Sequence, residues 1–173
     1  MKNLKISLLA ATGILLLLNS CGSDNDNELP EPVTTFKAIY HVEAKRNTLD
    51  GLEIIVKSAN ADGVMFVDTV RNNIYEREVL FTGLDSKAYM EVEAKVKTPI
   101  NEEALRDFFY TSSIIVKNVR VPYISNDATT WMSSRVENAH FIDWYLLTSG
   151  YWTSKQAQSA SVDDQGKVHY EYL

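Results

Sequence analysis

Residues 88–97 read Ala-Tyr-Met-Glu-Val-Glu-Ala-Lys-Val-Lys, and this stretch decides the fold class. Apolar residues take every second position from Ala88 to Val96, and four of the five remaining positions are charged. Side chains of a β-strand alternate between the two faces of its sheet, so this period predicts a strand with one buried face and one solvent face.

The same period returns in residues 36–45, where apolar side chains share one face and Ile39 is the only apolar residue on the other. Three further apolar segments lie between these two strands, each bounded by small flexible residues that supply a positive φ at a turn. The segments are Leu52–Lys57, Val64–Val70 and Glu76–Phe81, with turn signals at Asp50-Gly51, Asp62-Gly63 and Thr82-Gly83. We expect the five strands to form a meander.

The second half of the chain predicts one short helix and at least two more strands. Ile114–Ile124 is rich in β-branched residues, and Lys167–Tyr172 alternates again. Before them, Asn101 suits a helix N-cap, and Glu102 and Glu103 suit the positive end of the helix dipole. The apolar stripe of this helix, which we interpret as core packing, consists of Leu105, Phe108 and Phe109.

Length and composition fit a single globular domain. The chain has 173 residues, 45% of them hydrophobic and 23% charged, and its one cysteine excludes a disulfide framework. A chain of about 150 residues buries roughly 68–70% of its unfolded surface, which is enough for a hydrophobic core without disulfide bonds. Short strands with turn signals, one short helix and no internal repeat predict an all-β fold: an antiparallel β-sandwich, immunoglobulin/transthyretin-like, over residues 34–173.

The succession of strands resembles that of small MmpS-type or transthyretin-like β-sandwich lipoproteins. The resemblance is carried by Tyr40-His41-Val42-Glu43, Glu78-Val79-Leu80-Phe81, Tyr89–Lys95 and Ile114–Val121, about half of the chain. It implies a small accessory sandwich rather than a reaction.

The N-terminus has the pattern of a secretory signal. Lys2 and Lys5 precede an apolar run, Ile6–Leu18, which is shorter than the roughly 20 apolar residues that a transmembrane helix needs. Leu18-Asn19-Ser20-Cys21 resembles the lipobox of bacterial lipoproteins. The resemblance implies that residues 1–20 are a signal peptide and that Cys21 carries the lipid, a palmitate-type acyl group. The alternative is an uncleaved anchor helix with a chance cysteine.

The segment behind the cysteine is small, polar and acidic. Gly22–Glu28 resembles the surface-export signal of Bacteroidota-type lipoproteins. This implies a protein held in the outer membrane by its lipid and facing the cell exterior. The same composition also predicts a solvated, acidic and proline-containing tether over residues 21–33, and the two interpretations are compatible.

The charge balance excludes partners that need a basic surface. The chain has 17 Lys+Arg and 23 Asp+Glu; removing residues 1–20 takes away Lys2 and Lys5 and no acid, which leaves 15 against 23, a net charge of −8. Such a chain repels phosphate backbones and anionic lipid surfaces, so we expect no nucleic-acid partner and a membrane contact through the lipid alone.

All three tryptophans fall within residues 125–160, where neither strand nor helix period is clear. Trp131, Trp144, Tyr151 and Trp152 are therefore candidate ligand contacts, because an exposed aromatic ring can stack on a sugar, a porphyrin or a partner's side chain. The alternative is that these rings fill the core. Tyr151 and Trp152 are the candidates best placed for exposure, because they follow the turn signal at Gly150.

The sequence contains no Gly-x-Ser-x-Gly elbow, His-Glu-x-x-His, Ser-x-x-Lys or glycine-rich phosphate loop. We expect neither catalysis nor a metal or other cofactor. One alternative is a haem-binding surface lipoprotein, which needs two of His41, His140 and His169 to face one pocket. Another is a small cell-envelope glycan-active enzyme, which needs convergent carboxylates in a cleft. A purely structural role would show neither pocket nor aromatic platform.

One short match concerns modification. Asp68-Thr69-Val70 resembles the Asp-Ser/Thr-hydrophobic sequon at which secreted proteins of the same bacterial group are O-glycosylated, and it implies that Thr69 is exposed. The alternative is an ordinary polar strand residue. The sequence thus predicts a lipid-anchored cell-surface β-sandwich that acts as a non-catalytic binding or accessory protein for a glycan, a nutrient or a partner protein.

Overall fold

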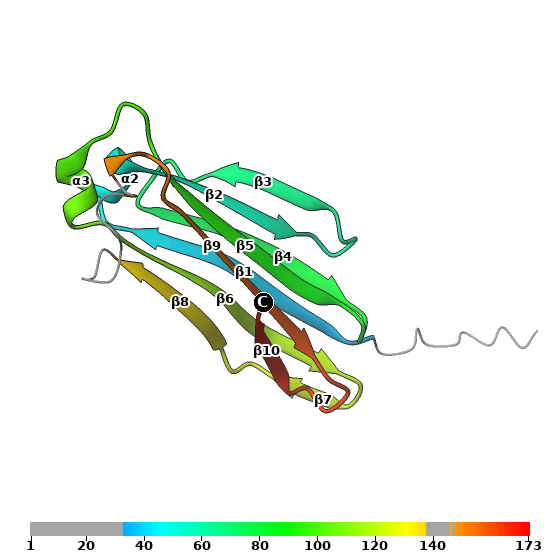
Figure 1. Ribbon diagram of the computed structural model, residues 1–173. Helices are drawn as coiled ribbons and strands as arrows, with labels where there is room; N and C mark the ends of the chain where they lie inside the picture. The colour runs from blue at the N-terminus through cyan, green and yellow to red at the C-terminus, as the bar shows by residue number, and fades with distance from the viewer. Residues whose placement is uncertain (1–32, 138–145, 147) are drawn as a thin grey trace, which may run out of the picture. The chain divides into compact units, whose positions relative to one another are not determined.

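The structure is a computed structural model that describes residues 33–137, 146 and 148–173, all within one compact unit, Pro32–Leu173. Two antiparallel β-sheets pack face to face (Figure 1), which confirms the predicted all-β sandwich with a short helix. The elements are β1 (Thr35–Ala44), α2 (Thr48–Gly51), β2 (Leu52–Ala59), β3 (Met65–Thr69), β4 (Ile74–Thr82), β5 (Lys87–Val96), α3 (Glu102–Arg106), β6 (Phe109–Val121), β7 (Ile124–Asn126), β8 (Thr130–Glu137), β9 (Thr153–Val162) and β10 (Val168–Tyr172).

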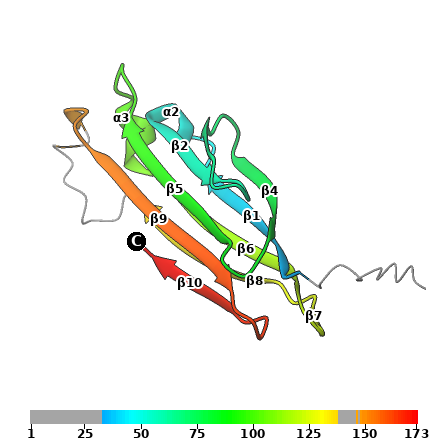
Figure 2. The same cartoon turned by 90° about the vertical axis from the view of Figure 1, so that its right-hand side faces the viewer.

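Sheet A has the strand order β4-β1-β6-β7, and β8 also pairs with β6. Sheet B has the order β10-β9-β5-β2-β3, and Figure 2 shows its strands β10, β9, β5 and β2 side by side. The predicted meander is wrong. The chain passes from sheet A to sheet B after β1 and returns after β3, so β1 pairs with β4 and β6 instead of β2. The alternating pattern marks a buried face but does not encode which sheet the strand joins.

The core lies between the inward faces of the two sheets. Phe36 and Tyr40 of β1 are fully buried, as the alternation predicts, and Leu52 and Ile54 of β2 are buried from the other sheet. Phe36 stacks on Phe81 of β4 with ring centroids 5.0 Å apart. Burying a large apolar side chain stabilises the fold by about 1.5–3 kcal/mol, so this layer supplies much of the stability.

Two short helices close one end of the sandwich. The predicted cap of α3 is confirmed, because Asn101 Oδ1 accepts a hydrogen bond from Ala104 N at 3.1 Å. The helix is shorter than its apolar stripe: it ends at Arg106, and Phe109 already belongs to β6. The second helix, α2, stands where the sequence suggested a turn at Asp50-Gly51.

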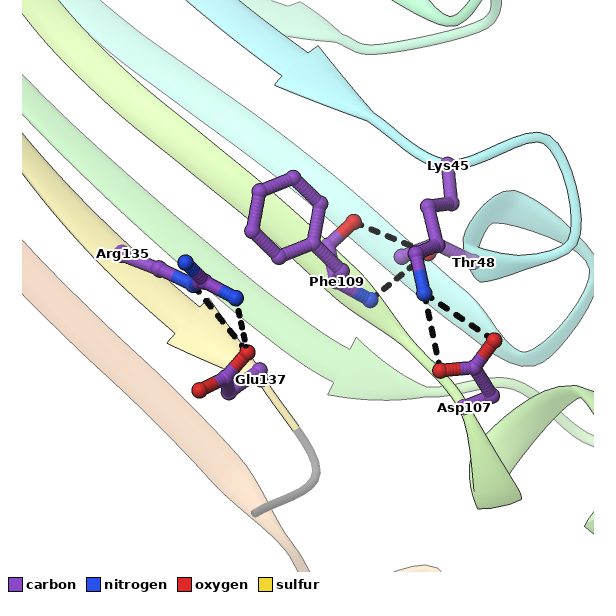
Figure 3. Close-up of polar contacts among 6 residues, drawn as sticks. All are labelled: Lys45, Thr48, Asp107, Phe109, Arg135 and Glu137. Atoms are coloured by element: carbon purple, nitrogen blue, oxygen red, sulfur yellow. Dashed lines mark hydrogen bonds and ion pairs between the residues drawn. The ribbon is translucent and has the colours of Figure 1, made fainter.

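Close packing explains why α2 ends on a glycine. A Cβ added at Gly51 would lie 3.0 Å from Leu105 Cδ2 of α3, so a larger residue would push the helices apart. The hydroxyl of Thr48 donates to Phe109 O and accepts from Phe109 N, both at 2.9 Å, which fixes α2 to the first residue of β6. Figure 3 shows this pair of hydrogen bonds at the end of sheet A.

The interior contains a polar network between β6, β8 and β9. Gln158 of β9 is buried, and its Nε2 donates to Ser112 Oγ at 3.1 Å and to Ser134 Oγ at 2.8 Å. Ser134 Oγ in turn donates to Gln156 Oε1 at 2.5 Å. These bonds join the two sheets by side-chain amide and hydroxyl groups.

Candidate functional site

Strands β4, β1, β6 and β8 belong to one sheet, in which β1, β6 and β8 follow one another (Figure 1). We call the surface formed by their outward side chains the sheet A face. The strand register places Ile39 of β1 opposite Ile115 of β6, and Ile115 opposite Trp131 of β8. Because directly paired residues of antiparallel strands project to the same side, the three side chains form a row across the sheet. Trp131 lies at the end of this row, on a strand whose one partner among the described strands is β6, and is 66% exposed.

A polar row runs beside the apolar one. It consists of Glu76, His41, Ser113 and Ser133, which are paired in this order across the four strands. The Nδ1 atom of His41 lies 2.9 Å from Glu76 Oε1. Of this row, the Ser133 hydroxyl is on the same strand as the exposed indole, whereas the carboxylate–imidazole pair lies two and three strands away.

Charged side chains on the other side of the apolar row are paired. Lys37 Nζ lies 2.7 Å from Glu78 Oε1, and Lys117 Nζ lies 3.6 Å from Glu78 Oε2. The hydrogen bond from Lys37 lowers the pKa of the Glu78 carboxyl, and the positive charges of Lys37 and Lys117 lower it further. This carboxylate stays ionised at neutral pH and can accept hydrogen bonds from a ligand.

Basic side chains occupy the end of the sheet A face near the helices (Figure 3). The guanidinium carbon of Arg135 lies 4.7 Å from the centroid of the Phe109 ring, and Lys45 Nζ lies 5.9 Å from it. Each cation also has an acidic partner: Arg135 bonds to Glu137, and Lys45 bonds to both carboxylate oxygens of Asp107 at 2.8 and 3.0 Å. The ring of Phe109 is thus already in contact with cations, whereas that of Trp131 is open to solvent.

The structure does not bring the candidate aromatic residues into one platform. Tyr151 is 81% exposed in the segment before β9. Trp152 is half-buried and packs on the core, with its ring centroid 5.2 Å from that of Phe108. Trp144 lies outside the described residues. Of the three candidates that the structure describes, Trp131 is the one that lies on a broad sheet surface with apolar and polar neighbours.

The two described histidines lie on opposite sides of the sandwich. His41 projects from the sheet A face, whereas His169 of β10 projects from the outer face of sheet B. Their carboxylate partners are Glu76 and Asp163, the latter at 2.8 Å from His169 Nε2. His140 lies outside the described residues. His41 and His169 therefore do not face one pocket, which is the arrangement that a haem site would need.

Glu91, on the outer face of sheet B, does not have the raised pKa of a general acid. Glu91 of β5 is 7% exposed, and its carboxylate lies 2.7 Å from Lys57 Nζ and 2.9 Å from Lys155 Nζ. Burial alone would raise the pKa of Glu91, but the hydrogen bonds and charges of the two lysines lower it below its usual value. A general acid for glycoside cleavage needs a raised pKa.

Within the described part of the chain, no group of three or more His, Cys, Asp or Glu side chains is arranged to hold a metal ion. Over the same residues, no helix is long and apolar enough to cross a membrane. Cys21 lies outside the described residues. Thr69 is exposed at the end of β3, as its sequon match implies, and the neighbouring Asp68 carboxylate accepts a hydrogen bond from the Tyr75 hydroxyl at 2.8 Å.

The sequence contained one unused signal for this surface. Ile39 interrupts the polar face of an otherwise regular strand, and the structure places it in the row that leads to Trp131. An apolar residue at an outward strand position marks either a covered face or a contact surface.

Comparison with known proteins adds no family assignment. The chain matches no protein-family model, no curated protein and no solved structure.

Proposed function

We propose that the protein is a lipid-anchored cell-surface binding protein, without a catalytic role, whose sheet A face binds a glycan. The observation that carries this proposal is the exposed indole of Trp131 at the end of the Ile39–Ile115 row. A large aromatic side chain that loses little conformational freedom on binding is an effective contact residue, and Trp is enriched in energetically dominant positions of binding surfaces.

The neighbours of Trp131 match the two kinds of surface that a sugar ring presents. The C–H face of a sugar packs on an indole and on adjacent aliphatic side chains such as that of Ile115. Its hydroxyl groups need donors and acceptors at the edge of that contact, and the exposed hydroxyl of Ser133, two residues from Trp131 on β8, can serve as both. An open sheet surface suits a polymeric glycan that extends past the edge of the protein.

The anchoring part of the proposal rests on the sequence. Lys2 and Lys5, the short apolar run and the lipobox-like Leu18-Asn19-Ser20-Cys21 together support lipidation of Cys21. We expect Cys21→Ala to lose fatty-acid labelling and to leave the membrane fraction. Digestion by protease added to intact cells then tests the outward orientation. Retention of Cys21→Ala in the membrane would contradict lipid anchoring, and full protection from protease would contradict exposure at the cell surface.

Glycan binding is tested by electrophoresis through gels that contain a soluble glucan, mannan, xylan or chondroitin sulfate. At least one polysaccharide should retard the wild-type protein, and Trp131→Ala should migrate as though the gel held none. Tyr151→Ala is the matched control, because Tyr151 is also an exposed aromatic residue but lies off the sheet A face. Circular dichroism checks that all variants are folded.

Three results would contradict the glycan proposal. One is no retardation by any polysaccharide together with capture of a protein partner that depends on Trp131. Another is equal loss of retardation in Tyr151→Ala and Trp131→Ala. A third is release of reducing sugar by the purified protein, which would favour the glycan-active enzyme instead.

A further inference from the structure

Strand β3 is the outermost strand of sheet B and pairs with β2 alone among the described strands. Its register with β2 runs without interruption from Ala59↔Met65 to Ile55↔Thr69. An unprotected edge of this kind presents a row of backbone N–H and C=O groups to which another strand can bond.

The hydrogen bonds at both ends of β3 show which of its residues direct their backbone N–H and C=O groups to the free edge. Asn60 N donates to Val64 O at 2.9 Å, and Val70 N donates to Ile54 O at 2.8 Å. Backbone groups of an antiparallel strand alternate in direction, so the even-numbered residues of this segment bond toward β2. The backbone groups of Met65, Val67 and Thr69 therefore point to the free edge.

The side chains along this edge are apolar and lack the usual protection. Val64, Met65, Phe66 and Val67 are consecutive, and their exposed fractions run from 39% for Phe66 to 64% for Val67. Edge strands of monomeric proteins are commonly protected by a lysine, a proline or a bulge. The run from Val64 to Val67 has no charged residue and no proline, and its pairing with β2 has no bulge.

Contacts with β4 hold the apolar run in place and neutralise the one charge that follows it. The guanidinium carbon of Arg77 lies 4.2 Å from the centroid of the Phe66 ring. Arg77 Nη2 also lies 3.1 Å from Asp68 Oδ2, the oxygen that accepts the Tyr75 hydroxyl. Because the charge of Asp68 is already paired, it does not repel a second acidic chain at this edge.

We propose that β3 pairs with β3 of a second copy of this chain, antiparallel and about a two-fold axis, with Val67 opposite its counterpart. In this register Met65 of one copy lies opposite Thr69 of the other. The backbone groups of all three edge residues, Met65, Val67 and Thr69, then form hydrogen bonds with the second strand. The two five-stranded B sheets would then join into one.

A second copy fits this edge better than an extended segment of a different protein. The edge carries no unpaired charge with which to select a foreign peptide, because Asp68 is paired with Arg77, and its own sequence matches itself in the two-fold arrangement. Phe66 of one copy would lie opposite Asp68 of the other, next to the Arg77 side chain that already contacts both residue types.

The test is cysteine cross-linking of the full-length chain in its own membrane. Facing residues in a hydrogen-bonded antiparallel pair have Cα atoms about 5.5 Å apart, which suits a disulfide. Mild oxidation should therefore convert Val67→Cys into a disulfide-linked dimer on a non-reducing gel. Tyr123→Cys is the control, because Tyr123 is fully exposed at the turn between β6 and β7, away from β3.

The register is tested with two variants that are expressed together. Met65→Cys and Thr69→Cys should cross-link to each other several-fold more than either cross-links to itself, and a Val67→Lys substitution added to both should abolish the product. Dimer formation by Val67→Cys no greater than by Tyr123→Cys would overturn the proposal. So would a predominant cross-link from position 67 to a different protein.

Discussion

The side-chain hydroxyl of Tyr40 in sheet A donates a hydrogen bond to the backbone oxygen of Ala59 in sheet B, across 2.7 Å. The same hydroxyl accepts a bond from Tyr89 N at 3.3 Å. One buried side chain of β1 therefore satisfies backbone groups of both β2 and β5 and ties the two layers together.

Removal of this hydroxyl should destabilise the protein without changing its fold. In Tyr40→Phe the buried oxygen of Ala59 loses its partner, which typically costs about 1–3 kcal/mol. Urea unfolding followed by tryptophan fluorescence measures the difference. Tyr123→Phe, at a fully exposed site, is the control and should leave the midpoint unchanged. Equal midpoints for both variants would show that the inter-sheet bond contributes nothing net.

Tyr40 also makes the free energy of unfolding depend on pH in the alkaline range. Burial raises the pKa of Tyr40 well above its ordinary value, and this effect outweighs the opposing bond from Tyr89. The folded state therefore holds the phenol proton more tightly than the unfolded chain. Its stabilising contribution is complete below about pH 10 and is lost as the pH rises above that value. Unfolding free energies from pH 9 to 11.5 should fall more steeply for the wild type than for Tyr40→Phe, and parallel curves would contradict this.

A second pH dependence is expected at the acidic end, from Glu91. Its lowered pKa means that its stabilising contribution is present above about pH 4.5 and is lost as the pH falls through the folded-state value. In the double variant Lys57→Gln/Lys155→Gln, the two lysine charges no longer oppose the effect of burial, and the pKa of Glu91 should rise. Stability relative to the wild type should therefore be lowest at neutral pH and recover toward pH 3.

The control for that experiment is Lys95→Gln. Lys95 Nζ pairs with the more exposed Glu93 at 3.0 Å on the same strand. Exposed pairs contribute little, so this variant should differ little from the wild type at any pH. A loss in the double variant that is equal at pH 7 and pH 3 would show that packing of the lysine side chains, not the charge of Glu91, is responsible.

Neighbouring aromatic residues before β9 should respond differently to truncation. Trp152→Ala removes a ring that packs on Phe108 and should cost about 3 kcal/mol of unfolding free energy. Tyr151→Ala should change stability by less than about 0.5 kcal/mol, because its side chain is exposed. Thermal melts of the two variants provide the comparison. If Trp152→Ala is as stable as the wild type but no longer binds glycan, Trp152 contacts the ligand instead of supporting the core.

Local features of the fold were predictable because they depend on a few neighbouring residues. The alternation in β1 and β5 gave the buried faces correctly, and Asn101 was identified as the helix cap. Gly63 and Gly83 have positive φ angles of 76° and 101°, as expected for the turns in which they lie. Each of these features is set by the alternation of side chains along a strand, by one side-chain hydrogen bond or by the backbone freedom of glycine.

Features that depend on distant pairing were not predictable from single residues. Between its β-branched ends, Thr153 and Val162, strand β9 has only small and polar residues, yet it lies inside sheet B between β10 and β5. Its inward amide, Gln158, is satisfied by Ser112 and Ser134, which are 46 and 24 residues away in the chain. A polar side chain can be placed inside only once its partners are known.

In the candidate site, too, the residue types could be selected from the sequence, whereas their exposure depends on pairing with distant residues. Sequence reasoning favoured Tyr151 and Trp152 over Trp131 for exposure. Tyr151 is exposed, but the expectation is wrong for Trp152, which is half-buried. Trp131 is exposed because the register pairs it with the outward-facing Ile115, whereas Trp152 meets Phe108 through tertiary packing. Exposure of an aromatic residue is thus decided by strand register.

The position of Thr69 has a consequence for assembly. Its side chain lies on the solvent side of sheet B, while its backbone belongs to the free edge of β3. A sugar attached to its hydroxyl would occupy the space that Met65 of a neighbouring copy needs. Glycosylated and paired molecules would therefore be mutually exclusive populations, and the extent of modification would set how many copies stay single on the cell.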